Sequence, residues 1–251
     1  MALSIEIREE AGVRSLHFGS HWIQGTMRIA RPYALELEYT RAMMLALLLR
    51  PGRRWPRQVL QIGLGAASLT KFLYRHRPRA ALTVAEIEPA VVAAARQFFK
   101  LPDDPGRLTI DIADGHDYVA RSAREFDLIL VDGFDAKGRS GMLDMLPFYC
   151  NARARLSAEG LLVANLLTRT RGITASLDRI RVAFDGRARP LPACGGGNTI
   201  VVAATGDPID IPLADLAAAA RALKRDTGLN LLPTLARLAA AGTGADERFL
   251  L

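Results

Sequence analysis

From Gln58 onward the chain alternates between short apolar segments and helical segments, and this alternation limits the fold more than any other feature of the sequence. Short runs rich in Val, Ile, Leu and Ala, bounded by turn residues, are typical of buried strands. Helical segments between strands predict a parallel sheet, because parallel strands need a crossover connection. The sequence therefore predicts an α/β fold with a mostly parallel sheet and helices on both of its faces. The predicted strands are residues 59–62, 81–85, 108–112, 126–131, 161–164 and 198–204.

Glycine or an acidic residue follows each of the first four strands. In a doubly wound sheet, ligands bind beyond the carboxyl ends of the strands, where the strand order reverses. A single Asp after a strand is explained equally well as the N-cap of the next helix, but four such strand ends in series favour a binding edge. The residues at these ends are Gly63 and Gly65, then Glu86, Asp114 and Asp132, and Asn165 lies near the end of the fifth strand.

The first of these ends has the character of a nucleoside site. Gly63 and Gly65 allow the backbone to turn tightly and approach a ligand closely, although Ser68 occupies the third glycine position of Gly-x-Gly-x-x-Gly. Glu86 follows Gly65 by about 20 residues, the spacing of an acid that binds ribose hydroxyls. Both NAD and S-adenosylmethionine satisfy these features. Asp114 favours S-adenosylmethionine, and hence the Rossmann-like fold of S-adenosylmethionine-dependent methyltransferases.

The segment 126–138, which reads FDLILVDGFDAKG, contains two carboxylates three residues apart, Asp132 and Asp135. Paired acids at the mouth of a site suit a cationic substrate or a general base. The alternative is a turn closed by an Asx-type hydrogen bond.

The remaining segments predict additions to this domain. Short alternating stretches in the first thirty residues predict a small antiparallel β-element, and the period and content of residues 35–49 predict one helix. Two amphipathic helices are expected in the tail. The predicted units are a β-element at 1–34, a nucleoside-binding catalytic domain at 35–205 and a C-terminal helical extension at 206–251, with the tail helices at 213–221 and 231–240.

Composition argues against several classes of protein. The net charge of +7 comes from basic residues spread along the chain rather than gathered in a patch, so no nucleic-acid partner is expected. The longest apolar run, 42–49, is too short to span a membrane. Two cysteines form no disulfide framework, and the acidic start is unlike a signal peptide, so a cytoplasmic location is expected. His17 and His21 have no convincing third ligand, and no metal is expected.

Taken together, these segments resemble the spermidine synthase (polyamine aminopropyltransferase) family. The resemblance extends from Gln24 to Ala204, and the loop 126–138 is the part most specific to aminopropyl transfer. The other segments are shared with methyltransferases generally. They are Gln24, the helix Glu36-Leu-Glu-Tyr-Thr-Arg-Ala-Met43, the glycine turn 59–68, Ala85-Glu-Ile-Glu88 and Ala113-Asp-Gly115.

The resemblance implies a role for each candidate site residue. Asp132 would be the catalytic carboxylate. The amine side would contain Asp135, which holds the distal ammonium of a diamine, with Gln24 and Tyr39 along the channel. The nucleotide side would contain Glu86 on ribose, Ile87 on the adenine face and Asp114 on the adenine amine, with Gly63, Gly65 and Gly115 beside them.

The sequence departs from the family at the amine side of the site. Ala66 stands where the family carries an Asp in its glycine turn, Thr40 and Arg41 replace a His-Glu pair, and Lys137 places a cation beside the expected amine site. The leading prediction is transfer of an aminopropyl group from decarboxylated S-adenosylmethionine to a polyamine acceptor such as putrescine. A methyltransferase that uses intact S-adenosylmethionine, or a non-catalytic nucleoside- or polyamine-binding relative, are the alternatives. The co-substrate replaces any prosthetic group. Family members are often dimers or tetramers, so the resemblance suggests a homodimer as one possible assembly.

Overall fold

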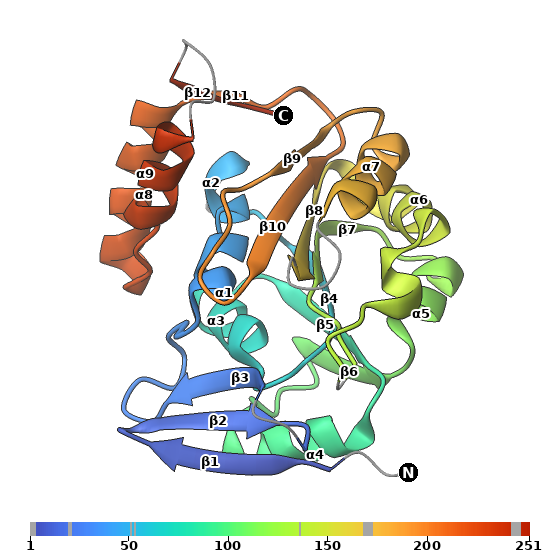
Figure 1. Ribbon diagram of the computed structural model, residues 1–251, viewed down its shortest axis with the longest axis vertical. Coiled ribbons are helices and arrows are strands. Elements are labelled where there is room, and N and C mark those ends of the chain that lie inside the picture. Colours follow the sequence, from blue (N-terminus) through green and yellow to red (C-terminus); the bar gives the residue numbers. More distant parts are fainter. Residues whose placement is uncertain are drawn as a thin grey trace.

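Figure 1 shows the computed structural model, which describes residues 4–19, 22–50, 52, 54–135, 137–167, 173–241 and 247–251. A seven-stranded sheet in the order β6-β5-β4-β7-β8-β10-β9 forms its centre. Within this sheet β4, β5, β6, β7 and β8 pair in parallel, whereas β10 is antiparallel to both β8 and β9. The order reverses at β4, which places the expected binding crevice between β4 and β7. The bounds are β4 Gln58–Ile62, β5 Ala81–Glu86, β6 Leu108–Ile112, β7 Phe126–Val131, β8 Leu156–Leu167, β9 Ala188–Pro190 and β10 Asn198–Ala204.

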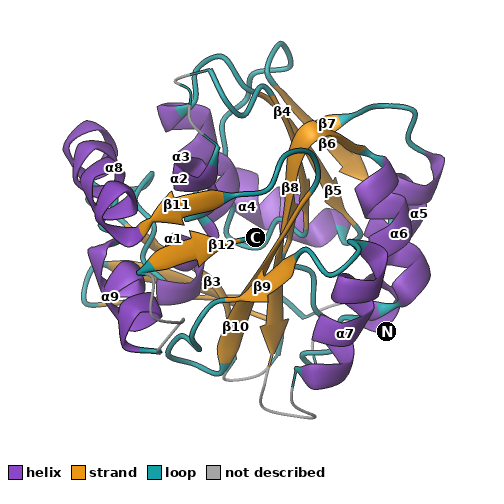
Figure 2. Cartoon of the chain, turned by 90° about the horizontal axis from the view of Figure 1, so that it is seen from above, coloured by secondary structure: helices purple, strands orange, loops and turns teal. Residues whose placement is uncertain are grey.

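Helices cover both faces of this sheet (Figure 2), which confirms the predicted α/β class. Successive strand residues point to opposite faces: on β8, Leu161 and Val163 belong to one apolar core, and Leu162 and Ala164 belong to the other. One face packs against α5 Gly115–Arg121, α6 Leu146–Ala154 and α7 Thr174–Ala183. The other face packs against α1 Glu38–Met43, α2 Ala46–Leu49, α3 Ser68–His76, α4 Pro89–Phe98, α8 Leu213–Thr227 and α9 Leu232–Ala240.

The N-terminal β-element is an antiparallel sheet of β1 Glu6–Glu10, β2 Val13–His17 and β3 Ile23–Arg28. Its last strand lies directly on the glycine turn that follows β4. A Cβ atom added to Gly25 would lie 2.6 Å from the Cβ of Ala66, and one added to Gly65 would lie 2.9 Å from the carbonyl oxygen of Gln24. The strand and the turn are therefore in backbone contact, and β3 forms one wall of the crevice.

The single helix predicted over residues 35–49 is wrong. The chain instead forms α1 and α2, separated by Met44 and Leu45. Here the backbone N–H groups of Met44 and Leu45 bond to the carbonyls of Arg41 and Ala42, three residues back, which is the tighter pattern of a 3₁₀ turn. Every residue from 42 to 49 is buried. A straight helix pattern with one apolar face does not describe a segment that is buried on all sides.

The fifth strand is also longer than the predicted 161–164, because β8 runs from Leu156 to Leu167. Its first residue, Leu156, pairs with Phe126 ahead of a register shift, and its second half pairs with β10. The tail helices are present, and α8 continues to Thr227, where Gly228 ends it with a positive φ of 79°. The two-stranded antiparallel sheet of β11 Asp210–Pro212 and β12 Arg248–Leu250, which lie on either side of α8 and α9 in the sequence, was not predicted.

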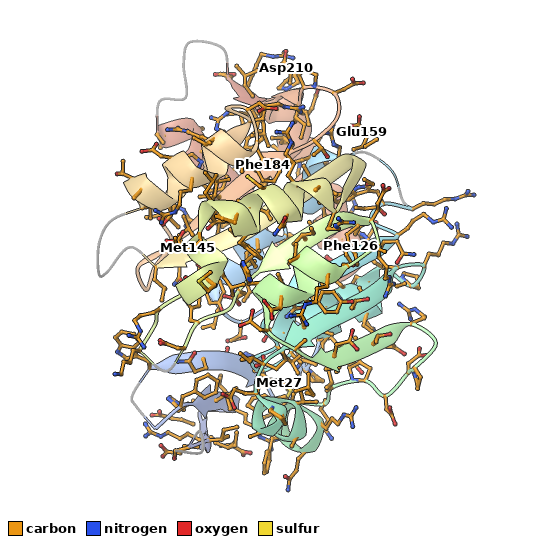
Figure 3. The ribbon with its side chains drawn as sticks, turned by 90° about the vertical axis from the view of Figure 1, so that its right-hand side faces the viewer. Met27, Phe126, Met145, Glu159, Phe184 and Asp210 are labelled. Atoms are coloured by element: carbon orange, nitrogen blue, oxygen red, sulfur yellow. The ribbon has the colours of Figure 1, made fainter. Side chains whose placement is uncertain are left out.

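The C-terminal helices lie far from the N-terminal sheet. In Figure 3, Met27 on β3 and Asp210 on β11 mark opposite ends of the molecule. Helix α9 nevertheless contacts the crevice side of the sheet, because Arg237 is hydrogen-bonded to Glu38 of α1. The other carboxylate oxygen of Glu38 accepts the backbone N–H of Gly195 at 2.8 Å. Within the described part of the chain, no helix combines the length and the apolar character needed to cross a membrane.

Candidate active site

A cavity of about 780 Å³ lies at the carboxyl ends of β4 to β7, between the large sheet and β3. All of the site residues predicted from the sequence line this cavity, although they come from segments far apart in the chain. They are Gln24, Tyr39, Gly63, Gly65, Glu86, Ile87, Asp114, Gly115, Asp132 and Asp135. The fold therefore brings these residues together into one site.

The glycine turn after β4 is shaped by its contact with β7. Gly63 has a φ of 86°, and a Cβ atom there would lie 2.3 Å from the carbonyl oxygen of Asp132. Gly65 also has a positive φ, 51°. Only glycine fits the first position, because the two strand ends approach each other at backbone distance. Helix α3 then starts at Ser68, so the turn opens directly into a helix N-terminus.

Glu86, at the end of β5, is buried and holds the glycine turn in place. Its Oε2 accepts the backbone N–H of Leu64 at 2.7 Å, and its Oε1 accepts that of Glu88 at 3.0 Å. Burial raises the pKa of Glu86, and these backbone donors partly oppose the shift. The adjacent Ile87 is 57% exposed and lines the cavity, so an apolar side chain stands open to a ligand beside a fixed carboxylate.

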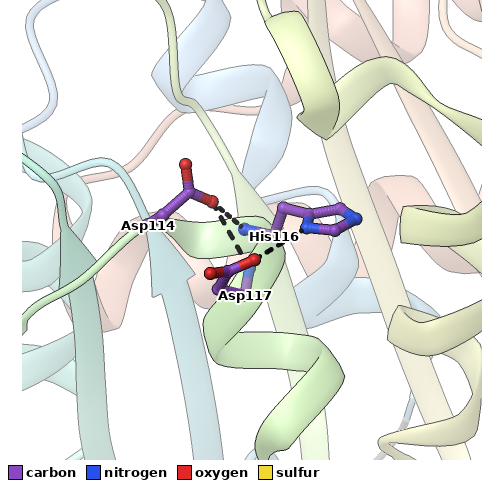
Figure 4. A group of neighbouring side chains, drawn as sticks. All are labelled: Asp114, His116 and Asp117. Carbon is purple, nitrogen blue, oxygen red and sulfur yellow. Dashed lines mark hydrogen bonds and ion pairs between the residues drawn. The ribbon is translucent and has the colours of Figure 1, made fainter.

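Asp114 is the N-cap of α5, as Figure 4 shows. Its Oδ1 accepts the backbone N–H groups of His116 at 2.8 Å and Asp117 at 3.3 Å, while its other oxygen points away from the helix. The His116 ring pairs with Asp117 at 3.2 Å. Asp114, His116 and Asp117 could approach one cation, but helix capping already explains their arrangement. Of the histidine pair considered from the sequence, His17 is buried and bonded to Ser15, and His21 lies outside the described residues.

Asp132 follows β7 at the floor of the cavity and is held by two uncharged groups. Asn165 donates from Nδ2 to its Oδ1 at 2.9 Å, and the Tyr39 hydroxyl donates to its Oδ2 at 3.1 Å. Desolvation raises the pKa of Asp132, against the opposing effect of these hydrogen bonds. Burial and the neighbouring Asp132 charge also raise the pKa of Tyr39, which keeps its proton on the phenol. The carboxylate thus has both oxygens positioned without a neutralising cation.

Asp135 lies on the same loop but is held by a charged group. Its Oδ1 accepts the backbone N–H groups of Lys137 at 2.8 Å and Arg139 at 2.9 Å. Its Oδ2 accepts Nε of Arg139 at 2.8 Å, and the guanidinium Nη2 is 2.7 Å away. Desolvation opposes the shift, but the hydrogen bonds from Arg139 and Lys137 outweigh it and lower the pKa of Asp135. Both readings of this loop from the sequence, an acid facing the site and an Asx-type turn, therefore apply to this one residue.

Two cavity residues that were given no site role from the sequence contact the predicted ones: Asn165 orients Asp132, and Arg139 pairs with Asp135. A third such cavity residue, Glu38, joins α1 to Gly195 instead. Asn165 carried the same signal as the acids, a polar residue after a predicted apolar strand, although the structure places it within β8. Glu38 carried none, because its contact with Gly195 joins residues separated by 157 positions in the sequence.

The fold defines a protein of the Rossmann-like methyltransferase class, and the carboxylates of Glu86, Asp114, Asp132 and Asp135 line its cavity. The sequence model of the spermine/spermidine synthase domain matches residues 37–169. The polyamine aminopropyltransferase of Chromobacterium violaceum is 39% identical over 79% of this chain and 75% of its own length. That of Neisseria meningitidis serogroup B is 34% identical over 98% of this chain and 92% of its own. A crystal structure of spermidine synthase in complex with the transition-state analogue AdoDATO shares the fold, with a TM-score of 0.68 and 22% identity over 94% of this chain and 85% of that one.

The chain belongs to the spermine/spermidine synthase family. The resemblance noted from the sequence motifs is confirmed, and so is the expectation of a transferase of the polyamine aminopropyltransferase type.

Proposed function

We propose that this chain transfers the aminopropyl group of decarboxylated S-adenosylmethionine to a polyamine acceptor such as putrescine. The observation that carries the proposal is the carboxylate of Asp132, oriented by Tyr39 and Asn165 in the cavity that also contains Glu86 and Asp114. A nucleoside-sized cavity with an oriented base at one end suits attack of an amine on a sulfonium co-substrate.

The nucleotide would lie across the glycine turn. The Glu86 carboxylate uses one backbone bond on each oxygen, and each oxygen can accept a further hydrogen bond from a ribose hydroxyl. Ile87 offers an exposed apolar surface for the adenine ring, and Asp114 has a second oxygen for the adenine amine. Gly63, Gly65 and Gly115 line the cavity beside the nucleoside position, and a Cβ atom at any of them would collide with a neighbouring segment of the chain.

The acceptor amine would approach Asp132 past Gln24 and Tyr39, with Asp135 on the distal ammonium. An alkylammonium has a pKa of about 10 and cannot attack until it loses a proton. Asp132 takes or relays this proton while the amine nitrogen forms a bond to the aminopropyl carbon. The carbon–sulfur bond breaks, its electron pair stays on sulfur, and the leaving group is a neutral thioether nucleoside.

The setting of Asp132 suits this step in two respects. Desolvation raises its pKa, which makes it a stronger base than an exposed Asp. Its partners Tyr39 and Asn165 orient both oxygens without adding positive charge that would repel the ammonium. A small-molecule amine as the substrate, a cytoplasmic location and a homodimer complete the proposal, on the analogy of the family.

Replacement of Asp132 by Asn tests the role of this carboxylate. We expect a loss of turnover of at least about 100-fold with putrescine and decarboxylated S-adenosylmethionine, because the general base is removed. Affinity for the nucleotide, measured by calorimetry, should stay within about twofold, since the nucleoside contacts lie on Glu86 and Asp114. Glu86→Ala is the matched control and should lose nucleotide affinity instead. Full activity of Asp132→Asn would remove this residue from the mechanism.

The donor is tested with the wild-type protein. Decarboxylated S-adenosylmethionine should support transfer to putrescine, with a new amine product detected by mass spectrometry. Intact S-adenosylmethionine, with methylated amine as the product, would identify a methyltransferase and overturn the proposal. Tight nucleotide binding without any product across a panel of amines would identify a non-catalytic relative.

A further inference from the structure

The position expected to receive the distal ammonium of the acceptor already contains a cation of the chain itself. The Arg139 guanidinium lies against Oδ2 of Asp135, with Nε at 2.8 Å and Nη2 at 2.7 Å. The other oxygen, Oδ1, accepts two backbone N–H groups of the same loop. A carboxylate with this set of donors has no unoccupied edge for a substrate ammonium.

Arg139 is also in the right place to compete for this carboxylate. It lines the cavity, and among the described residues that do so it is the single one with a Lys or Arg side chain. The side chain of Arg139 is 68% exposed and that of Asp135 is 40% exposed, so the ion pair opens to solvent. Exposed ion pairs contribute little stability, and a ligand ammonium can therefore replace the guanidinium at small cost.

The loop would keep its shape when the side chain leaves. Its backbone is closed by hydrogen bonds from Asp135 N to the Arg139 carbonyl at 3.0 Å and from Gly138 N to the Asp135 carbonyl at 2.9 Å. The two backbone donors to Oδ1 do not involve the guanidinium either. The Asp135 carboxylate therefore stays oriented toward whichever cation is present.

We propose that Arg139 is a specificity-determining residue that occupies the distal-ammonium position and must be displaced by a diamine acceptor. The inference rests on the proposed function and adds to it the selection among amines. A diamine gains contact with Asp135 only in exchange for the guanidinium, which weakens its binding. A monoamine of the same length makes no use of Asp135 and bears no such cost.

The test compares putrescine with butylamine, which has the same carbon chain and lacks the second ammonium. In Arg139→Gln we expect KM for putrescine to fall about two- to fivefold, as for loss of an exposed ion pair, with kcat unchanged. KM for butylamine should not change. Lys137→Gln is the matched control, because it removes one positive charge from the same loop while leaving the pair between Arg139 and Asp135 intact. It should leave both KM values within experimental error.

Two results would overturn the inference. One is an unchanged KM for putrescine in Arg139→Gln, and the other is an equal fall for butylamine, which would indicate a general effect of loop charge. Arg139→Lys keeps a cation without the two-pronged contact and should lie between wild type and Arg139→Gln. Failure of the proposed function is distinguishable, since the wild-type protein would then transfer to neither amine. Calorimetric titration of putrescine into wild type and Arg139→Gln still decides the inference in that case, with equal affinities counting against it.

Discussion

Asp132 and Asp135 follow the same strand, three residues apart, and their carboxylates are held in opposite ways. Asp132 is bonded by two neutral groups from other elements, and its pKa is raised. Asp135 is bonded by its own loop and by a guanidinium, and its pKa is lowered. The spacing of two acids therefore does not define two equivalent ligands for a diamine. What each acid can do depends on which donors the fold brings to it.

The largest effect expected from this comparison is on the pH dependence of activity, when Asp132 loses the hydrogen bond from Asn165. The hydrogen bond from Asn165 stabilises the ionised carboxylate, so Asn165→Ala should raise the pKa of Asp132 further. A hydrogen bond to a charged group contributes about 1.5–3 kcal/mol, and the acid limb of kcat/KM should move to higher pH by about one unit. Initial rates measured across pH would show about a tenfold loss on the acid side.

Asp135→Asn is the contrasting variant, and it should leave that acid limb where it is in wild type. A common shift of the limb in both variants would mean that the two carboxylates titrate as one unit, which would break the comparison.

A smaller effect is expected when Asp135 itself is replaced. In wild type its carboxylate is shared with Arg139, so Asp135→Asn should raise KM for putrescine by less than about fivefold. In the Arg139→Gln background the same replacement should cost more, because the carboxylate is then free for the substrate. A double-mutant cycle on KM measures this difference. Additive effects of the two changes would show that the ion pair does not compete with the substrate.

The smallest effects concern stability. Asp135→Asn should change the free energy of unfolding by less than about 1 kcal/mol, since it removes an exposed ion pair. Asp132→Asn should stabilise the protein at neutral pH. The pKa of the Asp132 carboxyl is higher in the folded state than in the unfolded state. Its contribution to stability is therefore present at low pH and is lost as the pH rises through the pKa of the folded state. Thermal unfolding at pH 7 and at acid pH should show the advantage of Asp132→Asn at pH 7 and its loss in acid.

The sequence predicted the site best where a glycine or polar residue directly follows an apolar strand. Short apolar strands followed by Gly63, Glu86, Asp114 and Asp132 predicted one edge of a parallel sheet, and the structure places these residues in one cavity. The roles assigned to them stay predictions. The pairing of Arg139 with Asp135 was not predicted, because it depends on the side-chain conformation within a loop rather than on a periodic pattern. The break in the helix predicted over 35–49 was missed because Met44 and Leu45 both favour helices and are buried like their neighbours, so the sequence does not mark the change of turn.

The contact between Gly25 and Ala66 has a consequence for how this protein can change over generations. A Cβ atom at residue 25 would lie 2.6 Å from the Cβ of Ala66 and 2.7 Å from its backbone nitrogen, so the obstacle remains whichever residue stands at 66. The two positions are 41 residues apart in the sequence. A larger residue at 25 is therefore expected to be accepted only if the backbones of the strand and the glycine turn move apart together. The N-terminal sheet and the glycine turn have to evolve as one unit.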